Sequence, residues 1–195
     1  MYIHVKRVMD VVLLALSAPL WIPLMIVLAV LVKLTSRGDV FFTQKRYGRG
    51  RVFFRIYKFR SMYADAPRDV PTHLLKDAQS HITPVGRFLR KTSLDELPQV
   101  INILKGELTL VGPRPALWNQ DDLIAAREKY GANDIPVGLT GLAQVHGRDE
   151  LPIETKAAYD GEYASKISFF LDVKILFLTA VQAITGSGVS EGGPK

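Results

Sequence analysis

One long uncharged apolar stretch near the start of the chain, Val11–Val32, stands apart from the mixed pattern that follows it. A helix of about 22 residues is roughly 33 Å long, enough to cross a bilayer. Pro19 and Pro23 argue against a straight helix, because each removes an amide donor and crowds the carbonyl four residues earlier. We therefore expect a break near the middle, where the Ser17 hydroxyl can bond a freed carbonyl. Asp10 is expected to cap the N-terminus of the helix.

Basic residues flank this stretch on both sides, with Lys6 and Arg7 before it and Lys33 and Arg37 after it. Positive residues favour the cytoplasmic face, so a segment that enters and leaves through one face satisfies both ends. The sequence thus predicts a re-entrant helix-break-helix within residues 1–35. A kinked spanning helix is the alternative, and a signal peptide is disfavoured because no A-x-A-like cleavage site follows the stretch.

Beyond this stretch the apolar pattern shortens to β-rich runs. Val40–Gln44 and Val52–Phe59 are joined by a basic, glycine-containing turn, which predicts a β-hairpin. Leu108–Val111 is expected to form a further short strand. It runs into a stiff turn in which Pro113 and Pro115 enclose one arginine.

Helical spacing of apolar residues predicts the remaining elements. The expected helices are Pro84–Lys91, Leu97–Leu104 ended by Gly106, Trp118–Tyr130 and Ile153–Ala164. The apolar segment Ile167–Ile184 fits either an amphipathic helix in the membrane interface or a buried core helix. The fold class is therefore α/β and mostly α. It comprises a membrane hairpin over residues 1–35, a compact cytoplasmic catalytic domain with interfacial helices over 36–185, and a flexible tail over 186–195.

Composition limits the kinds of metal site, crosslink and ligand that the chain can have. The 195 residues contain no cysteine, which excludes disulfides and thiolate metal sites, and the four histidines show no zinc-binding spacing. A formal net charge of +6 suits anionic lipid headgroups, phosphorylated substrates or nucleic acid. Seven basic residues between Lys45 and Arg60 alternate with aromatic ones, which indicates either an anion-binding surface or a solvated basic face.

Two adjacent carboxylates, Asp95 and Glu96, lie in a segment rich in basic residues. A capping box from Ser93 to Glu96 is one interpretation. Pro98 disfavours it, because a helix that starts at Asp95 instead places the proline harmlessly in the first turn. Carboxylates near arginines suit a divalent cation bound together with a phosphate, and a carboxylate can also attack phosphorus.

Several stretches across nearly the whole chain carry a resemblance. They are Lys6-Arg7 with Asp10, Val40–Gln44, Tyr57–Met62, Ser93–Gln99, Leu104–Glu107, Val111–Pro115, Gly138–Arg148 and Phe170–Ile175. Taken together in this order, they resemble bacterial sugar transferases of the monotopic phosphoglycosyl transferase family, close to the minimal PglC type. The chain departs from the family at Ile22, where serine often precedes the proline, and at Leu142 and His146.

The resemblance implies a reaction. A phosphosugar would pass from a UDP-sugar to polyprenol (undecaprenyl) phosphate on the cytoplasmic face of the bacterial inner membrane. UMP would be released, and the product would initiate glycoconjugate or polysaccharide assembly. It also implies Mg²⁺ as cofactor and a covalent phosphosugar intermediate on Asp95, with Glu96 holding the metal or assisting proton transfer. Pro23 matches the proline of the family's re-entrant helix.

Further candidates surround this dyad. Arg114, held between two prolines, is the best clamp for a diphosphate, whose charge grows on the leaving group. Four basic residues are weaker candidates for substrate binding, with a structural ion pair or a surface charge as the alternative. These four are Lys58, Arg60, Arg90 and Arg148. Gln144 and Asp160 are expected either to contact the nucleotide or to support the site.

Two other functions are alternatives to phosphosugar transfer. A non-catalytic, membrane-tethered binder of nucleic acid or anionic lipid would use the basic segment Lys45–Arg60, but it gives the carboxylate and arginine motifs no use. We expect no nucleic-acid partner. A one-step glycosyltransferase would release UDP instead of UMP. Protein partners that fit the family reaction are a second copy of the chain or downstream glycosyltransferases. The segment Ser187–Ser190 resembles the end of enzymes that act on diacetamido-bacillosamine, but the sequence does not fix the sugar.

Overall fold

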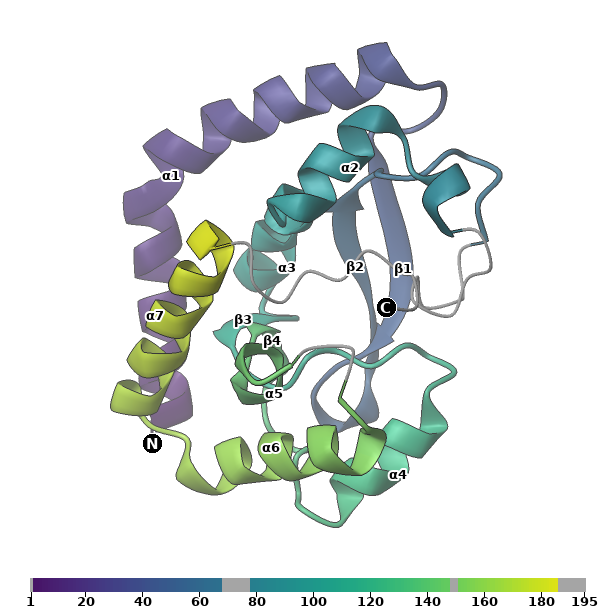
Figure 1. The fold of residues 1–195 in the computed structure, drawn as a ribbon. Coiled ribbons are helices and arrows are strands. Elements are labelled where there is room, and N and C mark those ends of the chain that lie inside the picture. The colour runs from purple at the N-terminus through teal and green to yellow at the C-terminus, as the bar shows by residue number, and fades with distance from the viewer. Residues whose placement is uncertain (1, 68–77, 148–150, 186–195) are drawn as a thin grey trace.

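A computed structural model describes residues 2–67, 78–147 and 151–185. The described chain is mostly helical, as predicted, with one antiparallel hairpin and one short parallel strand pair (Figure 1). Its helices are α1 (Tyr2–Thr35), α2 (Pro84–Lys91), α3 (Val100–Lys105), α4 (Asp121–Glu128), α5 (Leu142–Val145), α6 (Ile153–Lys166) and α7 (Phe169–Thr185). The strands are β1 (Phe41–Tyr47), β2 (Phe53–Phe59), β3 (Thr109–Val111) and β4 (Gly138–Thr140), and 3₁₀ turns are η1 (Arg49–Arg51), η3 (Ala78–His81) and η4 (Leu94–Gln99). Arg148 and the tail 186–195 lie outside the described residues.

The helix α1 runs without interruption through Pro19 and Pro23, so the expected break into two helices is not seen. Figure 1 shows instead that its axis bends about midway. The Ser17 hydroxyl donates to the Leu13 carbonyl at 2.7 Å, and the Trp21 indole donates to the Leu14 carbonyl at 2.9 Å. The carbonyls that Pro19 and Pro23 leave without an amide donor are those of Ala15 and Pro19, so the expected bond from Ser17 to a freed carbonyl is not what the described helix shows.

Both halves of α1 pack on the same globular body. In the first half Leu14 is buried with residues of β2 and α3, and in the second half Leu28 and Val32 are buried against Phe59 and Leu89. The outward face of α1 stays apolar and exposed, as at Leu16, Leu20 and Leu34. Within the described residues α1 alone is long and apolar enough to cross a membrane.

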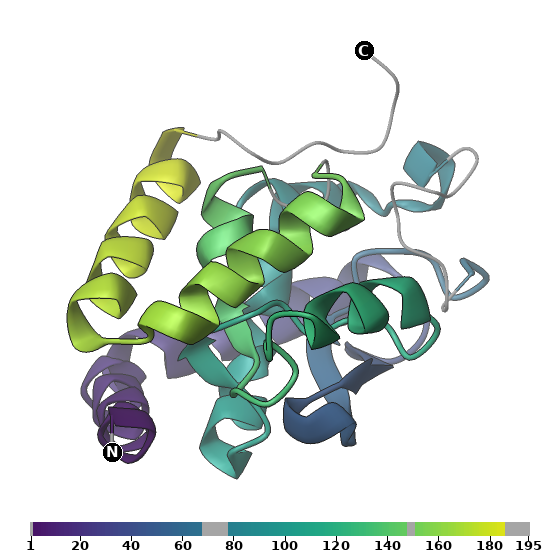
Figure 2. The same ribbon diagram turned by 90° about the horizontal axis from the view of Figure 1, so that it is seen from below.

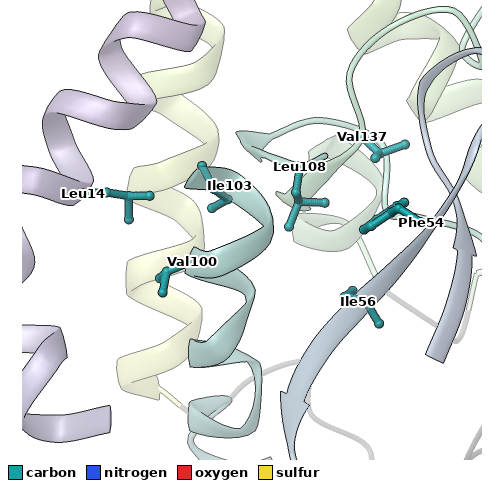
Figure 3. Packing of buried hydrophobic residues seen from close by; sticks show 7 residues of the cluster. All are labelled: Leu14, Phe54, Ile56, Val100, Ile103, Leu108 and Val137. Atoms are coloured by element: carbon teal, nitrogen blue, oxygen red, sulfur yellow. The ribbon is translucent and has the colours of Figure 1, made fainter. Parts of the chain in front are cut away.

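The hairpin of β1 and β2 forms one wall of the core. The strands form the antiparallel hairpin that the two β-rich runs predicted, and they pair with Phe41 opposite Phe59 and Tyr47 opposite Phe53. Figure 3 shows how buried side chains of the hairpin meet those of the helices, each burial contributing about 1.5–3 kcal/mol. The members of this cluster are Leu14, Phe54, Ile56, Val100, Ile103, Leu108 and Val137.

The strands β3 and β4 pair in parallel, with Thr109 opposite Gly138 and Val111 opposite Thr140. Glycine is required at 138, because a Cβ there would lie 2.0 Å from the Gly112 amide nitrogen. This close approach fixes the direction in which the chain leaves β3 and enters the turn that carries Arg114.

The helix α6 lies at the end of the molecule opposite α2, and α7 lies along its side, next to the first half of α1 (Figures 1 and 2). Ile175 and Asp172 of α7 are buried, while Phe170 and Phe177 are 83% and 68% exposed. The segment Ile167–Ile184 therefore has features of both an interfacial helix and a core helix, because one face belongs to the core and the other is an exposed apolar surface.

A cluster of buried charges joins α1 to this end. The Lys6 ammonium lies 2.5 Å from an Asp172 carboxylate oxygen, and Tyr2 and Tyr163 donate to the same carboxylate group. Asp10 accepts a hydrogen bond from Thr109 at the start of β3. The prediction that Asp10 caps a helix was wrong, because α1 begins eight residues earlier and its buried side chain serves a tertiary contact instead.

Candidate active site

The acidic residues Asp95 and Glu96 lie on η4, between α2 and α3. Ser93 precedes them in the left-handed conformation (φ 57°), and its side chain makes no capping hydrogen bond. The capping box is thus not formed. Pro98 lacks an amide hydrogen, and regular α-helix begins only at Val100, so the helix predicted from residue 97 to 104 is divided into a 3₁₀ turn and α3.

Glu96 is held by two cations from different parts of the chain. Its Oε1 atom accepts from Lys58 Nζ of β2 at 2.7 Å and from Arg114 Nη2 at 2.9 Å. The same Lys58 ammonium lies 4.0 Å from Asp95 Oδ2. The sequence predictions for these four residues therefore converge on one place, which joins the hairpin, η4 and the turn after β3.

Asp95, and not Glu96, faces a cavity between the hairpin and α2. The Asp95 residue is 9% exposed, so its carboxylate is reached through this cavity rather than from open solvent. Polar side chains that line the cavity with it are those of Gln44, Arg46, Lys58, Arg60, Ser61, Tyr63 and Arg90. With four basic side chains and one acid, this cavity suits an anionic ligand.

The two carboxyl groups titrate differently. Burial raises the pKa of Asp95 above its usual range, and the nearby Lys58 only partly offsets this effect. Burial would also raise the pKa of Glu96, but Arg114 and Lys58 together hold it far below its usual range. Environments that push two pKa values apart are typical of paired acids with separate roles. Glu96 is therefore a fixed anion, whereas Asp95 is the group that faces the ligand space.

Arg60 is the most buried of the cavity's basic residues, at 7% exposure. Its Nη2 atom donates to the carbonyl and the hydroxyl of Ser36, both at 2.8 Å, just beyond the end of α1. Its Nε and Nη1 atoms have no hydrogen-bond partner within the described part of the chain. Such donors in a buried cation favour an anion as their partner.

Arg114 lies in the turn that follows β3, and its guanidinium reaches Glu96 rather than the cavity lining. The main chain of this turn is fixed from two sides. Arg127 of α4 donates to the Arg114 carbonyl at 2.9 Å, and Arg46 of β1 donates to the Pro115 carbonyl at 2.9 Å. Arg127 and Arg46 therefore hold in place the main chain at Arg114, the residue expected to clamp a diphosphate.

The structure places the other candidates elsewhere. Asp160 is 1% exposed and pairs with Arg127 behind the turn, so support of the site is the role that this placement favours. Gln144 of α5 is also buried, donates to the Leu139 carbonyl at 2.8 Å and does not line the cavity. Its Oε1 atom has no hydrogen-bond partner among the described residues.

The basic segment from Lys45 to Arg60 does not form one face. Lys58, Arg60 and Arg46 line the cavity, whereas Arg49 donates to the Asp134 carbonyl and Arg51 pairs with Glu128. Arg46 was not among the residues that the sequence singled out as candidates for the site. Arg46 alternates along β1 with Gln44 and with Phe42, the residue paired with Lys58, and this alternation is the signal that would have placed it on the cavity side.

Two adjacent carboxylates fit the ligand preference of Mg²⁺, which takes hard oxygen donors and keeps open positions for phosphate and water. Asp95 supplies such oxygens in the lining of a cationic cavity, and Glu96 lies next to it in η4, outside that lining. Among the described residues, no cluster of three or more histidine, cysteine, aspartate or glutamate side chains is arranged to hold a metal ion. A Mg²⁺ ion at this place would accordingly rely on substrate oxygens for much of its coordination.

The chain is similar to known proteins over nearly its whole length. Residues 1–186 match the family described as bacterial sugar transferase. A UDP-N-acetylgalactosamine-undecaprenyl-phosphate N-acetylgalactosaminephosphotransferase from Aeromonas hydrophila is 39% identical over 193 residues, 96% of this chain and 45% of that protein. This chain thus spans less than half the length of that relative.

Two shorter relatives are matched over more of their length. A UDP-glucose:undecaprenyl-phosphate glucose-1-phosphate transferase from Caulobacter vibrioides is 41% identical over 190 residues, 92% of this chain and 70% of that protein. A sugar transferase from Bacillus subtilis named EpsL, described as uncharacterized, is 41% identical over 160 residues, 82% of this chain and 77% of that protein. The names of the two characterised relatives specify different sugars.

Proposed function

The chain belongs to the bacterial sugar transferase family, and from this premise we propose that it transfers a phosphosugar from a UDP-sugar to undecaprenyl phosphate, with release of UMP. The names of its relatives support the substrate class. The observation that carries the proposal is the placement of Asp95 in a cavity lined by four basic side chains, beside a Glu96 that is already neutralised. That arrangement suits attack of a carboxylate on a bound diphosphate.

We propose two chemical steps. In the first, a carboxylate oxygen of Asp95 attacks the sugar-bearing phosphorus, the bond from this phosphorus to the UMP oxygen breaks, and UMP leaves with the electron pair. In the second, a phosphate oxygen of undecaprenyl phosphate attacks the same phosphorus. The bond to Asp95 then breaks and the carboxylate is regenerated.

The other residues of the site contact the phosphate groups or hold Glu96 in place. Arg60 and Arg90 contact the phosphate groups from the cavity wall, while Lys58 and Arg114 keep Glu96 ionised and in place. Asp95 and Glu96 would hold Mg²⁺, which would neutralise diphosphate charge and make the phosphorus a better electrophile. Burial of Asp95 removes water that would otherwise hydrolyse a phosphosugar ester.

The contacts of α1 support a proposal for its placement in the membrane. Its first half is tied to β3 and α7, and its second half packs on the hairpin and α2. A helix whose two halves both contact one globular body, with an exposed apolar face between them, is suited to enter and leave the bilayer on one side. We propose that this is the cytoplasmic face of the inner membrane, and that Phe170 and Phe177 of α7 lie in the interface.

Identification of the nucleotide product tests this function. The purified chain in nanodiscs with undecaprenyl phosphate is given UDP-glucose or UDP-N-acetylgalactosamine, and the nucleotide is separated by chromatography. We expect UMP from at least one of them, and none from Asp95→Asn although it remains folded by circular dichroism. Asp39→Asn, at an exposed acid, is the matched control and keeps activity. UDP as the product would indicate a one-step glycosyltransferase, and full activity of Asp95→Asn would contradict the mechanism.

A further inference from the structure

We propose that the buried pair of Arg127 and Asp160 is a positioning device that fixes Arg114 beside Glu96. The proposal rests on the function proposed above and adds two residues to it. Arg127 had no place in the sequence analysis, and neither residue lines the cavity. Both act through Arg114, so they are positioning residues and not groups that touch a substrate.

The contacts form a continuous chain from α6 to the dyad. Asp160 of α6 accepts a hydrogen bond from Arg127 Nε at 2.8 Å and forms an ion pair with Nη2 at 2.6 Å. The same guanidinium donates to the Arg114 carbonyl at 2.9 Å, and the Arg114 side chain then reaches Glu96. One side chain thereby connects a carboxylate on one helix to the main chain of the clamp residue.

Packing alone gives little reason for this pair. The Arg127 and Asp160 side chains are only 3% and 2% exposed, and removing such charges from water is costly. The two helices already meet through an apolar contact that includes Ala126 and Ala157. Because well-packed apolar residues often stabilise a buried site at least as well as an ion pair, the hydrogen bond to the turn explains this pair better than helix packing does.

The turn itself needs such an anchor. Pro113 and Pro115 fix their own φ angles, and Pro115 also restricts the residue before it to extended torsions. These limits shape the turn but do not fix where it lies relative to η4. Arg127 fixes the Arg114 carbonyl, and Arg46 fixes the next carbonyl from the opposite side. These two contacts fix the main chain from which the Arg114 guanidinium reaches Glu96.

The variant Arg127→Lys tests the proposal. An ammonium keeps the charge opposite Asp160, but it lacks the planar fork that serves a carboxylate and a carbonyl at once. We expect kcat for UMP release to fall about 10- to 100-fold, with a much smaller change in KM for the UDP-sugar. In an Arg114→Met background the same substitution should change kcat by less than about twofold, because coupled residues are not additive.

A structural role would give a different pattern. Equal losses of kcat in both backgrounds, in proportion to lost folded protein, would overturn the positioning role. Lys129→Met is the matched control, because it breaks the exposed ion pair to Glu154 that also links the end of α4 to α6. It should leave kcat unchanged in either background. If Arg127→Lys does not fold, Asp160→Asn, which keeps the shape of the acceptor, replaces it in the same cycle.

A second measurement does not depend on turnover. Phenylglyoxal modifies accessible arginines, and peptide mass spectrometry gives the rate at Arg114 alone. A guanidinium released from Glu96 should react several-fold faster in Arg127→Lys than in wild type, and Lys129→Met should match wild type. Faster labelling in a chain that releases no UMP with any tested sugar would leave the positioning role intact and count against the proposed function. Unchanged labelling with UMP released by wild type would overturn the positioning role alone.

Discussion

The ammonium group of Lys58 lies 2.7 Å from Glu96 Oε1 and thereby connects the hairpin to the short turn that carries both acids. It is also 4.0 Å from Asp95 Oδ2, so one cation on β2 serves both carboxylates. The acid that faces the cavity depends on this cation for part of its charge balance, whereas Glu96 has Arg114 as a second partner.

Replacement of Lys58 by methionine should therefore affect the reaction more than the fold. We expect UMP release to fall at least about 100-fold, because both acids lose a stabilising cation in a buried site. Initial rates under saturating UDP-sugar provide the measurement. Lys45→Met, at an exposed lysine of the neighbouring strand, should keep wild-type rates. Equal rates in the two variants would contradict the role of Lys58.

The buried pair of Lys6 and Asp172 should matter for stability. Breaking a buried pair leaves one charge without its partner, so Lys6→Met should lower the free energy of unfolding by about 3–5 kcal/mol. Denaturant unfolding in detergent measures the change. Lys166→Met breaks the exposed pair with Glu162 and should cost less than about 1 kcal/mol. A similar loss of unfolding free energy in both variants would show that the buried pair of Lys6 and Asp172 stabilises the fold no more than an exposed ion pair does.

The bend of α1 predicts a sidedness result. Because the chain contains no cysteine, His4→Cys and Asp39→Cys each provide a single exposed labelling site near one end of the helix. A membrane-impermeant maleimide should modify both from the cytoplasmic face. Replacing Pro19 and Pro23 by alanine should straighten the helix and move part of the His4→Cys population to the other side. Labels on opposite sides in the unmodified background would contradict re-entry.

Removal of metal tests the proposed use of the dyad. Chelation with EDTA should abolish UMP release, and added Mg²⁺ should restore it, because the carboxylates are proposed to hold the ion. Glu96→Gln should require a higher Mg²⁺ concentration for half-maximal rate. Full activity in EDTA would rule out Mg²⁺ dependence, while leaving the covalent step open to its own test.

Local signals predicted the elements that depend on neighbours in sequence. Pro84–Lys91 forms α2 with the predicted bounds, because Thr83 caps it and Pro84 starts it. The hairpin also formed where the two β-rich runs and the glycine-containing turn indicated. The predicted break in α1 was wrong, since the proline rule concerns local backbone bonds and does not include the packing of both halves of the helix on one globular body.

Residues whose partners are distant in the sequence could not be placed in this way. Asp10 meets Thr109, and Lys6 meets Asp172, across separations of 99 and 166 residues. Within the site, the resemblance led to Asp95 and its neighbours. Arg127, on a short helix with other charged residues, had no pattern that distinguishes it from a surface arginine.

Intact-protein mass spectrometry is the most direct test of the proposed covalent phosphosugar intermediate on Asp95. Wild type incubated with a UDP-sugar substrate but without undecaprenyl phosphate should gain the mass of one phosphosugar. Peptide mapping should place it on Asp95, and addition of the lipid should remove it. A UMP-releasing enzyme that gains no such mass under rapid quench, or that carries it on another residue, would contradict the account.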